Sequence, residues 1–329
     1  MAASAAAGCS SESVLDVRPP TIETARPALS PPPASAPAGR VLRLDGRARS
    51  ALFDPATATL AVLNSADGSQ PAADTVVLLG DSAPPRTVRL PAPVEALTGD
   101  GRGTAYAAAR GAVVTVDLAD GTATRREIPG HGDTDFTAVA RRADGRLVLG
   151  SAAGAAYTLT PELEVAEEAD VFARVDAIVT QGDTAVVLDR GQTSVTALGA
   201  DGAPEQALRA GLGATTMVAD PAGRVLVADT RGGQLLVFTV DPLIERQAYP
   251  VGEAPYGLAG SERWTWVSQT AANAVVGYDL ATGIPVEKVR YPTVQQPNSL
   301  AFDEASDTLY VVSGSGAGVQ VITGAGGGR

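Results

Sequence analysis

The sequence contains very few cysteines, histidines, lysines and aromatic residues. Cys9 is the only cysteine, so an intrachain disulfide is excluded. Aromatic residues make up 4% of the chain and hydrophobic residues 45%, so valine, leucine, alanine and isoleucine must fill the core. These side chains suit β-strands that pack face to face.

Basic stretches and long apolar stretches are missing too. The net charge is −12, whereas nucleic-acid backbones require a basic surface, so we expect no nucleic-acid partner. No stretch reaches the roughly 18 continuous apolar residues that a membrane-spanning helix needs. We therefore expect that the chain does not cross a membrane.

Signatures of common catalytic sites are absent. The sequence has no Gly-x-Ser-x-Gly motif and no Gly-Lys-Ser/Thr motif, and 211–213 lacks the third glycine of a dinucleotide-binding loop. His131 is the only histidine, whereas zinc enzymes usually recruit two or three imidazoles or thiolates. We predict no metal and no cofactor. Calcium at Asp133 and Asp135 is a weaker alternative, because the EF-hand spacing is missing.

What the sequence does contain is a weak repeat. An apolar residue recurs at intervals of 45, 42, 39, 39, 41 and 42 residues. These positions are Leu52, Leu97, Val139, Ile178, Met217, Leu258 and Leu300. Seven copies at this spacing are typical of a β-propeller, in which each repeat forms one four-stranded blade. We predict an all-β chain with a seven-bladed propeller over residues 40–329.

Strands and short turns alternate within each copy. The fifth copy shows a turn at 220–223, a strand at 224–228, a second turn at 229–233 and a third strand at 234–238. Asp-Gly pairs such as Asp144-Gly145 are typical of tight hairpins. Trp264 and Trp266 alternate on one strand, so we expect both on one face, packed between blades; an aromatic platform at a groove is the alternative.

The seventh copy lacks a fourth strand. Its three strands fall at 299–302, 308–312 and 318–322. Residues 40–44, Arg-Val-Leu-Arg-Leu, precede the first copy and have no strand partner there. We predict that this N-terminal strand closes the last blade and removes two exposed sheet edges. Deleting residues 40–46 should then lower the melting temperature sharply.

The N-terminus is similar to a bacterial lipoprotein signal, because small residues directly precede Cys9. We predict that residues 1–9 are a truncated signal with its lipobox and that Cys9 carries the lipid. An incidental cysteine is the alternative, since Ala6 stands where leucine or valine is usual and the charged and apolar parts of a signal are missing. A start codon further upstream would explain both. Residues 10–39, rich in proline, are predicted to form a disordered, extended tether.

Several long segments resemble a known family. They are 19–23, 135–151, 172–195 and 284–322, and they resemble the LppL family of mycobacterial and other actinobacterial cell-envelope lipoproteins. The resemblance implies export, lipidation at Cys9 and a place at the outer face of the cytoplasmic membrane, without implying an activity. Residues 225–230 with 234–238 are also similar to the NHL and YVTN-type propeller repeat, which identifies a fold and not a function.

Propellers usually bind ligands at one mouth of the central channel. The loops before each innermost strand and those between the second and third strands gather polar residues there. Our candidate binding residues are Arg174, Asp176, Asp189, Arg190, Asp229, Arg231, Tyr256, Gln269 and Asn298. For each one the alternative is a turn or capping role. No catalytic residue is assigned.

The leading functional hypothesis is a membrane-anchored envelope lipoprotein whose propeller is a non-catalytic binding or scaffolding module. We expect a monomer, held to the membrane by lipid on Cys9, that binds an unknown envelope protein or small ligand. One alternative is an envelope hydrolase or oxidoreductase with its site at the channel mouth. Another is a substrate-capture lipoprotein that feeds a transporter.

Overall fold

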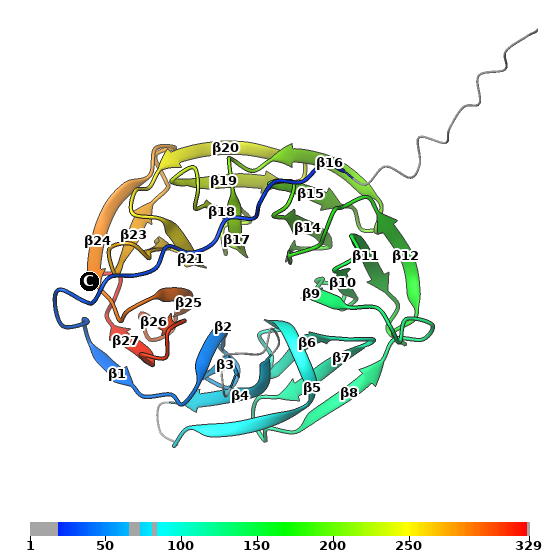
Figure 1. Ribbon diagram of the computed structural model, residues 1–329, viewed down its shortest axis with the longest axis horizontal. Coiled ribbons are helices and arrows are strands. Elements are labelled where there is room, and N and C mark those ends of the chain that lie inside the picture. Colours follow the sequence, from blue (N-terminus) through cyan, green and yellow to red (C-terminus); the bar gives the residue numbers. More distant parts are fainter. Residues whose placement is uncertain (1–18, 66–72, 81–83, 328–329) are drawn as a thin grey trace, which may run out of the picture.

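The computed structural model describes residues 19–65, 73–80 and 84–327. These residues form 27 β-strands and no helix, so no helix in the described part of the chain is long and apolar enough to cross a bilayer. The strands form one seven-stranded and five four-stranded antiparallel sheets. Figure 1 shows the sheets arranged as a ring around a central opening. The all-β propeller fold is confirmed.

The seven-stranded sheet contains two blades, because the long strand β5 (Arg86–Gly99) pairs with β4 at its start and with β6 at its end. Blade 1 is β2 (Arg47–Asp54), β3 (Thr59–Ser65), β4 (Ala73–Gly80) and the start of β5; blade 2 is the end of β5, β6 (Thr104–Ala109), β7 (Ala112–Asp117) and β8 (Ala123–Glu127). The sheet topology therefore gives seven blades of four strands each.

The next four blades follow the same order from the channel outward. Blade 3 is β9 (Phe136–Arg141), β10 (Leu147–Ser151), β11 (Ala155–Leu159) and β12 (Val165–Asp170). Blade 4 is β13 (Ala177–Gln181), β14 (Thr184–Asp189), β15 (Ser194–Leu198) and β16 (Pro204–Arg209). Blade 5 is β17 (Ala214–Ala219), β18 (Val225–Asp229), β19 (Gln234–Val240) and β20 (Leu243–Pro250). Blade 6 is β21 (Pro255–Gly260), β22 (Thr265–Gln269), β23 (Ala274–Asp279) and β24 (Val286–Pro292).

Blade 7 joins the two ends of the propeller. It contains β25 (Pro297–Asp303), β26 (Thr308–Ser313), β27 (Val319–Thr323) and, as its outermost strand, β1 (Arg40–Leu42). Strand β1 runs antiparallel to β27, with Arg40 opposite Val321 and Leu42 opposite Val319. The N-terminal strand thus closes the last blade as the sequence predicts, although it ends at Leu42 rather than at residue 44.

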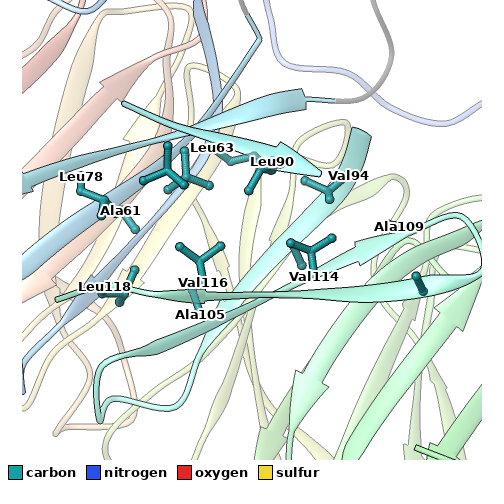
Figure 2. Close-up of a cluster of buried hydrophobic side chains, with 14 residues drawn as sticks. Ala61, Leu63, Leu78, Leu90, Val94, Ala105, Ala109, Val114, Val116 and Leu118 are labelled. Carbon is teal, nitrogen blue, oxygen red and sulfur yellow. The ribbon is translucent and has the colours of Figure 1, made fainter. Parts of the chain in front are cut away.

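Apolar side chains fill the spaces between neighbouring blades. Figure 2 shows the cluster between blades 1 and 2, where Leu63 and Leu78 face Val114 and Val116. Between blades 6 and 7, the fully buried Trp266 stacks on Phe302 at 5.7 Å between ring centroids. Trp264 belongs to the same cluster. Both tryptophans therefore pack between blades, as their alternation predicts.

Residues 19–39, which we name the strap, lie along the propeller, whereas the sequence predicts a disordered tether. The N–H of Ile22 donates to the carbonyl of Gly191 in blade 4 at 2.7 Å, and the N–H of Ala38 donates to Pro292 in blade 6 at 3.0 Å. The strap crosses blades 4 to 6 in Figure 1 before it enters β1. Residues 10–18, the rest of the predicted tether, lie outside the described residues.

Tyr278 packs in the apolar cluster between blades 5 and 6. Burial raises the pKa of its hydroxyl to about 12, and the nearby Glu287 carboxylate adds to the shift. The folded state thus holds this proton where the unfolded chain releases it. Because the folded pKa is the higher one, this stabilising contribution is complete below about pH 10 and is lost as the pH rises towards about 12.

We expect Tyr278→Phe to remove this pH dependence, because phenylalanine keeps the ring and has no proton to release. Urea unfolding measured between about pH 9 and about pH 11.5 should show a smaller loss of stability for the variant than for the unchanged protein. Equal losses in the two proteins would show that Tyr278 ionises alike in the folded and unfolded states.

Candidate functional site

The strap marks one of the two faces of the propeller. This strap face carries the loops that precede each innermost strand and the loops between the second and third strands. Gly191 and Asn273 lie in loops of the second kind, and Gln296 lies in a loop of the first kind. All three bind the strap. The strap face is therefore the one on which the sequence places the candidate binding residues.

The central channel contains a cavity of about 540 Å³. The innermost strands of blades 1 to 5 line it, mostly with small and apolar side chains. The charged residues in the lining are Glu95, Arg141 and Asp176. Glu95 and Asp176 stand at the start of the inner strands of blades 2 and 4, at the end of the channel that opens on the strap face. We name this end the mouth.

A β-bulge recurs where the inner strands reach the mouth. In blade 2, Val94 lies opposite Ala109 and Ala96 opposite Ala108, so Glu95 has no partner in the ladder. The same shift leaves Arg49, Thr137, Thr215 and Asn298 unpaired in blades 1, 3, 5 and 7, and it falls at Tyr256 and Gly257 in blade 6. Bulges redirect side chains. The repeat thus places mostly polar residues at the mouth end of the inner strands, although Thr137 and Thr215 are buried there.

Asp176 joins two of the arginines at the mouth. Its Oδ1 accepts from Nε of Arg174 at 3.2 Å, and its Oδ2 accepts from the backbone N–H of Arg190 at 2.8 Å. Burial raises the pKa of the Asp176 carboxyl, although both arginine charges act in the opposite direction. The sequence-predicted residues Arg174, Asp176 and Arg190 are therefore gathered at one point of the mouth.

Glu95 and Arg49 face the same region from blades 2 and 1. Burial raises the pKa of the Glu95 carboxyl, while the charges of Arg49 and Arg174 lower it. The effect of burial on the pKa of Glu95 therefore exceeds the opposite effect of two arginine charges, as it does at many functional sites. Glu95 and Asp176 are partly buried carboxyls with raised pKa values at one channel mouth, and such groups are candidates for a functional site.

A second cavity, of about 300 Å³, opens beside the mouth over blades 1, 6 and 7. Its lining is Arg47, Ala48, Arg49, Ser65, Tyr256, Asn298 and Gly314. Gly314 leaves room for Asn298, since a Cβ at position 314 would lie 2.3 Å from its Nδ2 and would force this side chain to move. Tyr256 and Asn298, both predicted from the sequence, thus share one polar cavity with two arginines that were not predicted.

Asp189 and Asp229 have a structural role in their blades. Both are fully buried. Asp229 accepts from the backbone N–H groups of Leu212 and Gly213 at 2.8 Å each and of Gly232 at 2.9 Å. Asp189 accepts in the same way from three backbone N–H groups. Because their oxygens are occupied by turns, these carboxylates have the capping role that is the alternative to binding.

The remaining predicted residues bind either the strap or a side chain of an outer strand. Nη2 of Arg231 donates to the carbonyl of Glu23 at 2.6 Å, and Nη2 of Arg190 donates to Ala25. Gln269 is buried in blade 6, where its Oε1 accepts from Arg290 at 2.6 Å. Part of the predicted binding face thus already binds a segment of its own chain.

His131 lies against the aromatic side chains of blade 3, with its ring centroid 4.9 Å from that of Tyr157. Asp133 is exposed and paired with Arg110 at 3.1 Å. Within the described residues, no group of three or more histidine, cysteine or acidic side chains is placed to hold a metal ion. Cys9, the predicted lipidation site, lies outside the described residues.

Comparison with known proteins identifies the fold alone. No family model and no curated protein matches the chain. Similar solved structures include an inactive His-to-Ala variant of virginiamycin B lyase from Staphylococcus aureus, with 12% identity and a TM-score of 0.70 over 86% of this chain and 98% of that chain. A chain of the mitotic checkpoint complex has 12% identity and a TM-score of 0.72 over 93% and 98%. Hydrazine synthase of Kuenenia stuttgartiensis has 15% identity and a TM-score of 0.66 over 86% and 97%.

Proposed function

We propose that this protein is an envelope lipoprotein, held by lipid on Cys9 at the outer face of the cytoplasmic membrane, whose propeller binds a ligand at the mouth of its channel. The observation that carries the binding role is the mouth itself. It brings Arg49, Arg174 and Arg190 together in a chain whose net charge is −12. Such a local concentration of arginines, which outnumber the two carboxyls of Glu95 and Asp176 at the mouth, is expected where a ligand is captured.

A binding role is better supported than catalysis by histidine. The virginiamycin B lyase among the similar structures is described as catalytically inactive when a histidine is replaced by alanine. In this chain His131 is the only histidine, and it packs on Tyr157 in the outer part of blade 3. It does not belong to the lining of either cavity at the mouth.

The anchor is tested by expressing the gene with its native upstream region in an actinobacterial host. The unchanged protein should partition into the detergent phase of Triton X-114 and incorporate a palmitate analogue. Cys9→Ser should do neither, and Ser10→Ala is the matched control, since it changes the next residue and keeps the thiol. Recovery of the Cys9→Ser protein with the lipid label would reject lipidation at this position.

The binding role is tested by capture from envelope extracts with immobilised residues 10–329. We expect a ligand or protein that is retained by the unchanged chain and lost with Arg174→Glu, which reverses a charge at the mouth. Arg110→Glu, an exposed change on blade 2, should retain it. A capture that is identical for all three proteins would place binding elsewhere and contradict the proposal.

One observation favours the hydrolase alternative. Glu95 and Asp176 both have carboxyl pKa values raised by burial, and a raised pKa is what a carboxyl needs to serve as a general acid. Metal analysis of the purified protein and a screen of ester and glycoside substrates test this alternative. Turnover that is lost in Glu95→Gln or Asp176→Asn would support it.

A further inference from the structure

The cavity beside the mouth has more hydrogen-bond donors than acceptors. Arg47 and Arg49 line it, and in the described part of the chain neither guanidinium has a hydrogen-bond or ion-pair partner. Arg190, across the mouth, has a buried Nε without a partner. Arg47 and Arg49 are exposed, so their donors are open to solvent and to a ligand, whereas the buried Nε of Arg190 is costly to leave without an acceptor. A ligand that satisfies them must be rich in acceptors.

Tyr256 lies between the two groups of arginines. Arg190 in blade 4 and Arg49 in blade 1 are both close enough for their charges to act on its hydroxyl. Among the described residues, no hydrogen bond to this hydroxyl is formed. The phenol therefore adds one more available donor at the centre of the arginine cluster.

Asn298 is oriented by a chain of hydrogen bonds that begins in the strap. Nε2 of Gln296 donates to the carbonyl of Ala28 at 2.9 Å and to Oδ1 of Asn298 at 3.0 Å, while Oε1 of Gln296 accepts from the N–H of Ser30 at 3.0 Å. Since Oδ1 of Asn298 is occupied, its Nδ2 group is the part that remains for a ligand. The strap thus fixes, through Gln296, which end of the Asn298 amide is available to a ligand.

We infer that the cavity lined by Arg47, Arg49, Tyr256 and Asn298 is an oxyanion site, which takes the phosphate or carboxylate group of a small ligand. Guanidinium groups bind both oxyanions through charge-assisted hydrogen bonds, often two at a time. This inference rests on the proposed function, because it names the chemistry of the ligand that the mouth would bind.

The test is calorimetric titration of residues 10–329 with inorganic phosphate and with succinate, against sodium chloride of equal ionic strength. We expect saturable binding of at least one of the two oxyanions, with a dissociation constant of millimolar or below. Binding of phosphate alone assigns a phosphate-bearing ligand, and binding of succinate alone assigns a carboxylate. Binding of neither overturns the inference.

Variants locate the site. Arg47→Gln and Arg49→Gln should each weaken oxyanion binding by at least about tenfold, as the loss of a charge-assisted hydrogen bond does. Asn298→Asp, nearly isosteric, should abolish binding because it replaces the donor with a negative charge. Arg110→Gln, at an exposed position in the loop between β6 and β7 that lines neither cavity, should leave it unchanged. Equal binding by Arg47→Gln, Arg49→Gln and the unchanged chain would overturn the site.

The outcome of the oxyanion titration can be told apart from the outcome of the capture and lipid-labelling tests of the proposed function. If neither oxyanion binds but Arg174→Glu still abolishes capture from envelope extracts, the binding role stands and the oxyanion site fails. If phosphate or succinate binds at the site but Cys9→Ser remains lipid-labelled and capture is unselective, the site stands and the proposed function fails.

Discussion

A chain that begins at residue 47, and so lacks β1, should melt roughly 10 °C below a chain that begins at residue 40. Strand β1 is the outer strand of blade 7, and its pairing with β27 ties the start of the propeller to its last sheet. Without it, β27 becomes an open edge, and blades 1 and 7 are held together by apolar packing and by the hydrogen bond from the N–H of Ala51 to Oγ of Ser299. Both chains lack the strap, so the difference measures residues 40–46 alone.

The size of this effect follows from what the strand buries. Leu42 and Leu44 pack against the cluster of buried residues that includes Val319 and Val321. Fully burying a leucine side chain stabilises a protein by about 1.5–3 kcal/mol, and the partly buried Leu42 and Leu44 lie at the lower end of this range. Two leucines with the backbone ladder contribute on the order of 5 kcal/mol, and each kcal/mol shifts the melting temperature of a domain this large by roughly 2 °C.

Scanning calorimetry or circular dichroism would measure the difference. A point variant separates the loss of packing from the loss of the strand, because Leu42→Asp keeps the backbone ladder and removes the apolar contact. Val41→Thr is its matched control, since Val41 is 40% exposed. If the two shortened chains melt at the same temperature, the ring does not depend on β1 for its closure.

The sequence predicts this closure because strand number can be counted. Each blade needs four strands, the seventh copy supplies three, and one strand is left over at residues 40–44. The strap is different. The propeller binds it mostly through backbone groups, such as the carbonyls of Glu23, Ala25 and Ala28, and every residue carries a carbonyl. Composition therefore predicts that residues 19–39 are extended, but it does not predict that they dock.

The sequence predicts only some of the residues at the mouth, because others lie inside strands and not in loops. A search of loops finds Arg174 and Arg190, whereas Arg47, Arg49 and Glu95 lie inside strands β2 and β5. The repeat carries a signal for some of them. Glu95, Asp176, Tyr256 and Asn298 each stand two residues before an aligned apolar residue: Leu97, Ile178, Leu258 and Leu300. Arg49 breaks this register, since the bulge of blade 1 falls three residues before Leu52.

Replacing Asp229 with alanine should destabilise the propeller by at least about 3 kcal/mol. The carboxylate is fully buried and accepts three backbone hydrogen bonds, from the loop that precedes β17 and from the turn after β18. Alanine leaves the buried N–H of Gly213 and the partly buried N–H groups of Leu212 and Gly232 without their acceptor, at about 1–3 kcal/mol for a fully buried donor and less for the other two. Since folded proteins are stable by about 5–15 kcal/mol, this loss is a large part of the total.

Asp229→Asn should fall between alanine and the unchanged protein. Its Oδ1 still accepts from Gly213 and Gly232, but its Nδ2 then faces the N–H of Leu212, and two donors repel each other. Asp133→Ala is the matched control, because this carboxylate is exposed and its ion pair with Arg110 contributes little. Urea unfolding measures all three. If Asp229→Ala costs no more than Asp133→Ala, the loops of blades 4 and 5 hold their shape without the carboxylate, and Asp229 becomes free for the binding role that its position in the repeat first indicated.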